Sequence, residues 1–259
     1  MFGALAKTYY AQKKGMKAEN MVSVSIMPCT AKKYEANRPE MRDSGYQDVD
    51  YVLTTRELAA MVRQAGIDFG QLEDEKYDSI MGDSSGAAVI FGATGGVMEA
   101  ALRTAYEIVT GREVPFDNLN ITPVRGLQGV REAKVKIEDV KPEWGFLEGA
   151  ELSCAIAHGL SNANKLMKKV KAGEMEYHFI EIMACPGGCL GGGGQPMPVS
   201  DEIRQARMDA IYEEDSSLEI RKSHENPEVQ ALYEEFLGEP LGHKSHELLH
   251  THYKGRKRY

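Results

Sequence analysis

Residues 181–198 read EIMACPGGCLGGGGQPMP and combine two cysteines with a dense run of glycines. Cys185 and Cys189 are two of only four cysteines in the 259-residue chain. A flexible linker is the simplest interpretation of so many glycines, but linkers rarely contain a Cys-Pro-Gly-Gly-Cys sequence. Glycine also lets the backbone approach a bound group closely, because it lacks a Cβ atom and tolerates positive φ angles. The stretch therefore favours a soft metal site, and thiolate-only ligand sets are typical of zinc or iron–sulfur clusters.

A third cysteine has a similar setting earlier in the chain. SIMPC (25–29) and EIMAC (181–185) each place a cysteine two residues after a methionine, at the end of a predicted strand. Ligands of open α/β sheets bind beyond the carboxyl ends of strands, so we expect Cys29 and Cys185 to face one cavity. A structural zinc site would more often use a second cysteine pair with a two-residue spacer. For Cys29 taken alone, a buried thiol at a strand end remains the alternative.

The neighbouring side chains allow both a structural and a functional interpretation. Lys32 and Lys33 follow Cys29 closely. We expect Lys33 to be a solvated residue at a helix start, whereas Lys32 could be held near an anionic cofactor. Met27 and Met183 would ordinarily fill a core, but beside a metal site they could form a thioether wall. Cys154 lies inside the apolar run ELSCAIAH and is predicted to be a core residue.

Short apolar runs alternate with helical patterns along residues 1–198, which predicts an α/β fold with largely parallel strands. Two helices are well delimited: one begins with a capping box at Thr54 and Glu57, and another covers 95–110 and ends at Gly111. Buried strands are expected at 22–27, 49–53, 151–159 and 178–183. Antiparallel or edge strands are expected at 118–126 and 133–140.

The remaining segment, 199–259, is polar and helical, and it is too small to have a core of its own. We expect it to wrap around the main domain. The chain carries 31 basic and 39 acidic residues, for a net charge of −8, and has no extended basic cluster, so no nucleic-acid partner is expected. No apolar run reaches the roughly 18 residues that a membrane span requires. Four cysteines do not make a disulfide framework in a chain of this length, and no signal peptide is visible, so we expect a cytoplasmic protein.

Several motifs carry a specific family resemblance. MPCTAKKYE (27–35) and EIMACPGGCLGGGGQP (181–196) resemble the second and third cluster-binding motifs of the iron-only, or FeFe, hydrogenases. GATGGVMEAALRTAYE (92–107) and AIAHGLSNANKL (155–166) are similar to the same family, and the resemblance covers essentially the whole chain. It implies the fold of the hydrogenase catalytic domain, with mostly parallel sheets in two lobes around a cluster site. Residues 1–198 would form that domain, and 199–259 would be a helical tail similar to the family's small subunit.

The resemblance also implies a cofactor, the H-cluster. In this family it consists of a 4Fe-4S cubane joined through one cysteine sulfur to a di-iron subsite with carbon monoxide, cyanide and dithiolate ligands. The matching thiols would be the cubane ligands Cys29 and Cys185 and the bridging thiolate Cys189. Lys32 would hydrogen-bond a cyanide. The residues expected to line the cofactor are Met27, Pro28, Met183 and Gly188.

The implied reaction is the reversible reduction of two protons by two electrons to dihydrogen, with Lys32, Cys189, Met27 and Met183 as the catalytic group. A ferredoxin or similar carrier would supply the electrons, and maturation proteins would build the cofactor. The family's first motif, a Thr-Ser-Cys-Cys-Pro-type segment with the fourth cubane ligand and a proton-relay cysteine, is absent. We therefore expect a C-terminal portion that needs an upstream segment or subunit for activity.

A second hypothesis is a non-catalytic relative, similar to the prelamin A recognition factor-like proteins, that acts in iron–sulfur protein assembly. Cys189, Lys32 and the small-subunit-like tail favour the hydrogenase. A third hypothesis is a folded but inert fragment, which would fail to hold iron even when the upstream segment is supplied.

Overall fold

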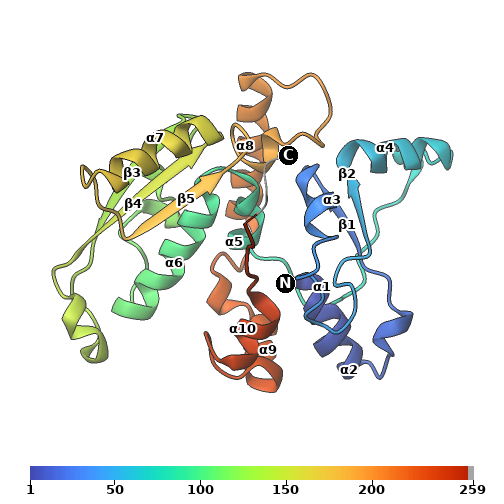
Figure 1. Ribbon diagram of the computed structural model, residues 1–259, viewed down its shortest axis with the longest axis horizontal. Coiled ribbons are helices and arrows are strands. Elements are labelled where there is room, and N and C mark those ends of the chain that lie inside the picture. The colour runs from blue at the N-terminus through green and yellow to red at the C-terminus, as the bar shows by residue number, and fades with distance from the viewer. Residues whose placement is uncertain (256–259) are drawn as a thin grey trace. The chain divides into compact units, whose positions relative to one another are not determined.

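A computed structural model describes residues 1–255, which divide into two compact units (Figure 1). Unit 1 contains residues 1–83, 194–196 and 227–255, and unit 2 contains residues 84–193 and 197–226. The C-terminal tail therefore contributes to both units and forms no separate unit of its own.

Unit 1 is built on two parallel strands, β1 (Val24–Met27) and β2 (Tyr51–Thr54). Both lie where the sequence predicts buried strands, although β1 alternates between exposed and half-buried residues. Its helices are α1 (Phe2–Leu5), α2 (Ala11–Lys13), α3 (Ala31–Glu35), α4 (Thr55–Gln64), α9 (Pro227–Leu232) and α10 (His243–Leu249), with π-helical turns at Ala6–Tyr10 and Tyr233–Leu237. The N-terminal and C-terminal helices share one apolar cluster, in which Ala4 and Leu5 pack with Leu237 and Leu248. This packing ties the end of the tail to the start of the chain.

The predicted capping box of α4 is confirmed, and it also holds α3. Glu57 N–H donates to Thr54 Oγ1 at 3.2 Å, and Thr54 N–H donates to a Glu57 carboxylate oxygen at 2.8 Å. The same carboxylate lies 2.8 Å from Lys33 Nζ, which also donates to Val52 O at 2.8 Å. The Lys33 ammonium and the two Thr54 donors lower the pKa of Glu57 to about 2. Lys33 lies in the first turn of α3 with its side chain 42% exposed, in agreement with its interpretation as a solvated residue, and it also pairs with Glu57.

Unit 2 contains a three-stranded sheet in the order β3–β4–β5. Strand β3 (Val130–Lys136) is antiparallel to β4 (Glu151–His158), and β4 is parallel to β5 (Phe179–Met183). The remaining helices are α5 (Gly86–Val89), α6 (Gly96–Thr110), α7 (Leu160–Lys171) and α8 (Asp201–Ser217). Two of the three strand pairings found within residues 1–255 are parallel, which confirms the α/β class.

Residues 154–157 of β4 are buried on both faces of the sheet, which explains their apolar sequence, Cys-Ala-Ile-Ala. Cys154 and Ile156 point into the cluster with α6, whereas Ala155 and Ala157 pack in the cluster with Leu166 of α7. Figure 1 shows α6 and α7 on opposite sides of the sheet. Because side chains alternate along a strand, a strand covered on both faces needs apolar residues at every position.

The predicted strand at 118–126 is wrong. This segment forms two 3-10 turns, Asp117–Leu119 and Thr122–Val124. Pro123 has no N–H for a sheet ladder, and Asn118 has a φ of +50°, which an extended strand cannot contain. The backbone oxygens of Asn118 and Leu119 instead accept hydrogen bonds from buried arginines.

None of the helices described for residues 1–255 combines the length and the apolar character needed to cross a membrane.

Candidate functional site

The predicted site residues fall into two groups, one in each unit, and each group follows a β-strand. The group in unit 1 is Met27, Pro28, Cys29 and Lys32. The group in unit 2 is Met183, Cys185, Gly188 and Cys189. The strand-end placement that the sequence predicts for both cysteine motifs is thus confirmed.

In unit 1, the cysteine motif borders a pocket of about 500 Å³ whose walls include Met27, Lys32 and residues of β1. Cys29 lies between β1 and α3 and is half-buried. Lys32 Nζ lies 3.0 Å from Glu35 Oε2, and the two side chains are 44% and 40% exposed. An ion pair this exposed is weak, so an anion in the pocket can compete with Glu35 for the ammonium group.

The end of the glycine run contacts this same motif. Gly194 N–H donates to Pro28 O at 2.9 Å, and Gly194 O accepts from Arg56 N–H at 3.2 Å. A Cβ atom on Gly194 would lie 2.9 Å from the Pro28 carbonyl carbon and 2.9 Å from Thr54 Cβ. Glycine is required here because two backbones meet without room for a side chain. The contact between Gly194 and Pro28 therefore fixes the end of the glycine run against the first cysteine motif within unit 1.

In unit 2, the Cys185–Cys189 segment is a fixed turn. Gly188 N–H donates to Cys185 O at 3.0 Å, and a short 3-10 turn, Cys189–Gly191, follows. Gly188 has φ +90° and ψ −153°, a region that is essentially restricted to glycine. A Cβ atom there would lie 2.7 Å from Thr94 N and 2.8 Å from Met183 Sδ. The flexible-linker interpretation of this stretch is therefore wrong.

Two residues without an assigned role in the sequence analysis support this turn. Thr94 N–H donates to Gly187 O at 3.0 Å. Glu181 is buried, and its carboxylate accepts from Gly95 N–H at 2.6 Å and Met98 N–H at 2.8 Å, at the start of α6. Burial raises the pKa of Glu181, and the two N–H donors partly offset that effect. The sequence gives one signal for this contact between Glu181 and the start of α6. Glu181 is an acidic residue within an otherwise apolar strand, and a glycine-rich helix start lies far upstream.

The donor chemistry of the accessible cysteines suits an iron–sulfur group. None of the four cysteines forms a disulfide, and Cys29, Cys185 and Cys189 all have solvent-accessible surface. Their soft sulfurs, with a methionine preceding each motif, are the chemistry that iron–sulfur clusters select. Gly188 provides a turn in which backbone can lie close to a bound group.

Cys154 is excluded from the donor set. It is fully buried in β4, and burial raises the pKa of its thiol to about 11. The sequence-based interpretation of Cys154 as a core residue is confirmed.

The thiols should therefore differ sharply in reactivity. At pH 8 we expect iodoacetamide to label Cys189, which is exposed, and to leave Cys154 unlabelled in the native chain. The rise of the Cys154 pKa from 9 to about 11 lowers its thiolate fraction about 100-fold, and burial blocks access as well. Mass spectrometry of tryptic peptides, before and after denaturation, measures the labelling. Equal labelling rates of the two cysteines in the native chain would contradict this assignment.

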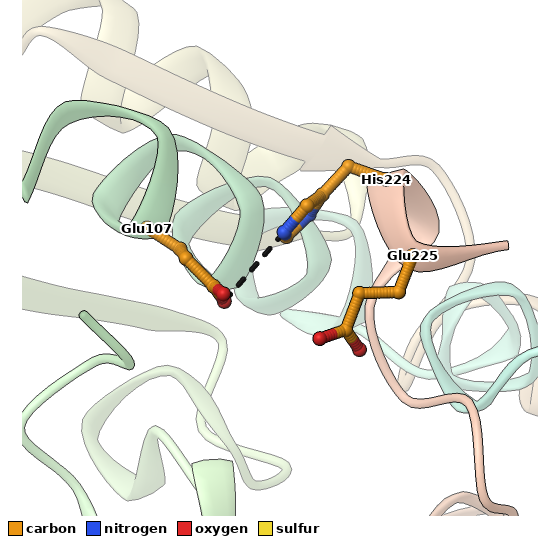
Figure 2. A group of neighbouring side chains, drawn as sticks. All are labelled: Glu107, His224 and Glu225. Carbon is orange, nitrogen blue, oxygen red and sulfur yellow. Dashed lines mark ion pairs between the residues drawn. The ribbon is translucent and has the colours of Figure 1, made fainter. Parts of the chain in front are cut away.

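A group of potential metal ligands without cysteine also occurs in unit 2 (Figure 2). Within residues 1–255, Glu107, His224 and Glu225 place ligand atoms within 4.8 Å of one another. Lys222 Nζ lies 2.6 Å from Glu107 Oε2 and 2.8 Å from Glu225 Oε1. The buried ammonium group already supplies the positive charge between these carboxylates, so we interpret the group as an ion-pair cluster.

Two family models together match nearly the whole chain. The model described as iron only hydrogenase large subunit, C-terminal domain, matches residues 1–193, and the model described as iron hydrogenase small subunit matches residues 201–256.

Similar proteins include the NADP-reducing hydrogenase subunit HndD of Solidesulfovibrio fructosivorans, which is 53% identical over 100% of this chain and 42% of its own length. Iron hydrogenase 1 of Clostridium pasteurianum is 44% identical over 98% of this chain and 43% of its own length. The chain thus spans less than half the length of these two relatives.

A solved structure of the FeFe hydrogenase HydA(deltaEFG), which revealed stepwise H-cluster assembly, superposes with a TM-score of 0.82 at 44% identity. The match covers 97% of this chain and 67% of that chain. Relatives named for iron–sulfur assembly are less similar: the cytosolic iron-sulfur assembly component 3 of Mus musculus is 31% identical over 98% of this chain and 52% of its own length.

Proposed function

Because the chain belongs to the iron-only hydrogenase family, we propose that it is the cofactor-binding part of an enzyme that reversibly reduces protons to dihydrogen. The observation that carries this proposal is the hydrogen bond from Gly194 N–H to Pro28 O, by which the end of the glycine run packs within unit 1 against the residue before Cys29. A flexible linker would make no such defined contact. The greater similarity to hydrogenases than to assembly components supports hydrogenase over the assembly alternative.

We assign the cofactor ligands by matching the family motifs. Cys29 and Cys185 would bind the 4Fe-4S part of the H-cluster, and Cys189 would be the thiolate that bridges to the di-iron part. When bound, this group supplies the redox chemistry that joins two protons and two electrons as dihydrogen.

Other residues near the cysteines would bind a ligand of the cofactor, exclude water from it and leave space beside it. Lys32 Nζ would leave Glu35, from which it is separated by 3.0 Å, and donate to an anionic ligand of the cofactor. The thioethers of Met27 and Met183 would exclude water from the bound group, together with Pro28. Gly188 would keep the backbone beside Cys189 free of a side chain.

We propose three kinds of partner. A ferredoxin or similar carrier would deliver electrons, and maturation proteins would insert the cofactor. An upstream hydrogenase segment or subunit would supply the fourth cubane cysteine and the proton relay, in keeping with relatives more than twice as long as this chain. We place the protein in the cytoplasm, where thiols stay reduced, and expect no nucleic-acid partner because the net charge is −8.

We also propose that residues 1–198 act as the hydrogenase domain and 199–259 as its small-subunit-like tail, in agreement with the two matched segments.

The test is anaerobic reconstitution of the chain with iron, sulfide and a synthetic di-iron dithiolate complex. Two samples are compared, one with and one without a co-expressed upstream segment that carries the missing cysteines. Infrared absorption measures carbon monoxide and cyanide bound to the protein, and gas chromatography measures hydrogen. We expect infrared bands from a protein-bound subsite and hydrogen production in the sample with the added segment.

Two outcomes contradict the proposal. Iron–sulfur loading without carbon monoxide or cyanide bands in either sample would favour the assembly function. No bound iron in either sample would mean that the chain is an inert fragment.

A further inference from the structure

His158, at the carboxyl end of β4, makes hydrogen bonds through both ring nitrogens. The residue is buried, with 7% of its surface exposed. Gly187 N–H donates to His158 Nδ1 at 3.1 Å, and His158 Nε2 lies 3.1 Å from Leu127 O. An imidazole that accepts at Nδ1 carries its proton on Nε2 and donates from there to the Leu127 carbonyl. The two partners therefore fix both the tautomer and the orientation of the ring.

The backbone that carries this ring is also fixed. His158 N–H donates to Gly129 O at 3.0 Å, and Asn162 Nδ2 donates to His158 O at 2.9 Å. The next residue, Gly159, donates its N–H to Met183 O at 2.9 Å, which ties the end of β4 to the end of β5. These polar residues belong to the AIAHGLSNANKL motif, for which the proposed function gives no role.

The peptide that His158 holds lies midway between two of the proposed cofactor ligands. Gly187 follows Cys185 by two residues and precedes Cys189 by two. Gly187 is buried, and both of its backbone groups are bound, the N–H by His158 and the oxygen by Thr94 N–H at 3.0 Å. Without an acceptor at His158 Nδ1, the Gly187 N–H would be a buried donor with no partner.

We propose that His158 is a positioning residue that sets the direction of the Cys185 and Cys189 thiols by holding the Gly187 peptide. Because peptide units are planar, a fixed Gly187 restricts the dihedral angles through which the two cysteines can turn. The inference rests on the proposed function only for the identity of the group that the thiols bind. The hydrogen bond between Gly187 and His158 is present in the chain without iron, so it can be tested without the cofactor.

The test compares two variants of the full chain, in each of which a carboxamide replaces one of the two ring nitrogens of His158. In His158→Gln, the amide can still donate near the position of Nε2, but no acceptor remains near Nδ1. In His158→Asn, the carboxamide oxygen keeps an acceptor near Nδ1, while the donor to Leu127 is lost. The matched control is His178→Gln, because His178 Nδ1 also accepts a backbone N–H, from Ser153 at 3.1 Å, at an exposed position.

Three readouts are taken: hydrogen exchange of the Gly187 amide, the alkylation rate of Cys185 by iodoacetamide, and iron bound after reconstitution. We expect His158→Gln to raise the exchange rate and the alkylation rate about tenfold, the size expected for one lost hydrogen bond to a buried donor. Iron bound to His158→Gln should fall below half of the wild-type amount. His158→Asn and His178→Gln should remain within twofold of wild type in all three readouts.

Equal effects of the Gln and Asn variants, or no effect of either, would overturn the positioning role. If His158→Gln does not fold, the decision rests on His158→Asn, in which loss of protection at Gly187 would overturn the proposal. Failure of the wild-type chain to bind iron would contradict the proposed function, while exchange and alkylation would still decide the role of His158.

Discussion

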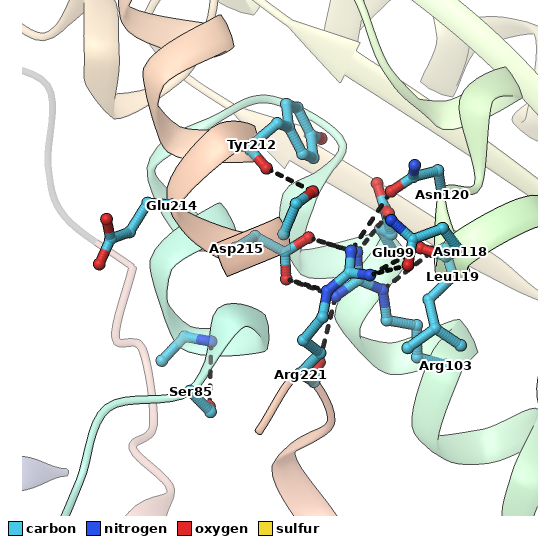
Figure 3. A network of polar contacts seen from close by, with 12 residues as sticks. Ser85, Glu99, Arg103, Asn118, Leu119, Asn120, Tyr212, Glu214, Asp215 and Arg221 are labelled. Carbon is cyan, nitrogen blue, oxygen red and sulfur yellow. Dashed lines mark hydrogen bonds and ion pairs between the residues drawn. The ribbon is translucent and has the colours of Figure 1, made fainter. Parts of the chain in front are cut away.

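Asp215→Ala is expected to lower the free energy of unfolding by about 3–5 kcal/mol, the cost of removing one partner from a buried ion-pair network. Asp215 is fully buried in α8. Its carboxylate accepts from Arg103 Nη1 and Nη2, both at 2.8 Å, and from Arg221 Nη2 at 2.6 Å (Figure 3). Without Asp215, both guanidinium groups would remain buried with too few acceptors. Urea or guanidinium unfolding followed by circular dichroism measures the change.

The matched control is Glu214→Ala, one residue earlier on the same helix. Glu214 is exposed and points away from the network in Figure 3, so we expect a change within about 0.5 kcal/mol. Similar losses in the two variants would mean that the Asp215 network does not stabilise unit 2. Burial alone would raise the pKa of Asp215, but the Arg103 and Arg221 guanidinium groups hold it below 3.8. The contribution of this carboxylate is therefore fully present above about pH 4 and is lost as the pH falls through its lowered folded-state pKa.

The same network explains how the tail becomes part of unit 2. Arg103 also binds Glu99 Oε1 at 2.7 Å, and Glu99 Oε1 lies 2.6 Å from Arg125 Nη2. Glu99, Arg103 and Arg125 belong to the segment that matches the large subunit, whereas Asp215 and Arg221 belong to the segment that matches the small subunit. Buried charges demand specific partners, so this network fixes how α8 packs within the unit.

The sequence predicts those parts of the fold that depend on local pattern. The capping box of α4, the end of α6 at Gly111 and the doubly buried strand β4 follow from residue types at neighbouring positions. Contacts between distant residues are not visible in such patterns. Arg103 and Asp215 are 112 residues apart, and each alone would be expected on a solvated helix face. The strand predicted at 118–126 is wrong for the same reason: the backbone oxygens of these turns accept hydrogen bonds from Arg103 and Arg221, which are distant contacts or contacts between side chain and backbone that a local pattern does not show.

In the candidate site, too, the sequence predicts the local features and misses the contacts between distant residues. Cysteine spacing and the glycine run are local, and they identify Cys185 and Cys189 as a turn with thiolate chemistry. The acceptor for the Gly187 N–H is 29 residues away, in His158, and periodicity alone would interpret that histidine as part of a buried strand. Gly194 and Pro28 meet only after folding, so the requirement for glycine at 194 could be suspected from the sequence but not explained.

Gly188→Ala is expected to remove iron binding by the Cys185–Cys189 turn and to lower the free energy of unfolding by about 2–5 kcal/mol. Two costs add: strain from φ +90° and ψ −153° in a residue with a Cβ atom, and overpacking of that atom. The Cβ would lie 2.7 Å from Thr94 N, a backbone atom that cannot rotate away. The turn must therefore shift, and the shift displaces Cys189, the next residue. Iron per chain after anaerobic reconstitution and denaturant unfolding measure the two effects.

The control variant Gly126→Ala separates the clash from backbone strain. Gly126 also lies in unit 2 and has φ +112°, but a Cβ atom there meets nothing within 4 Å. Gly126→Ala should therefore lose only the strain energy, about 1–2 kcal/mol, and bind as much iron as wild type. If Gly188→Ala behaves like Gly126→Ala in both measurements, the turn can rearrange around a side chain and its packing against Thr94 is not needed for the thiols. If iron binding falls in Gly188→Ala alone, the close approach at Gly188 is what holds Cys189 in place, because strain of the same sign is present in both variants.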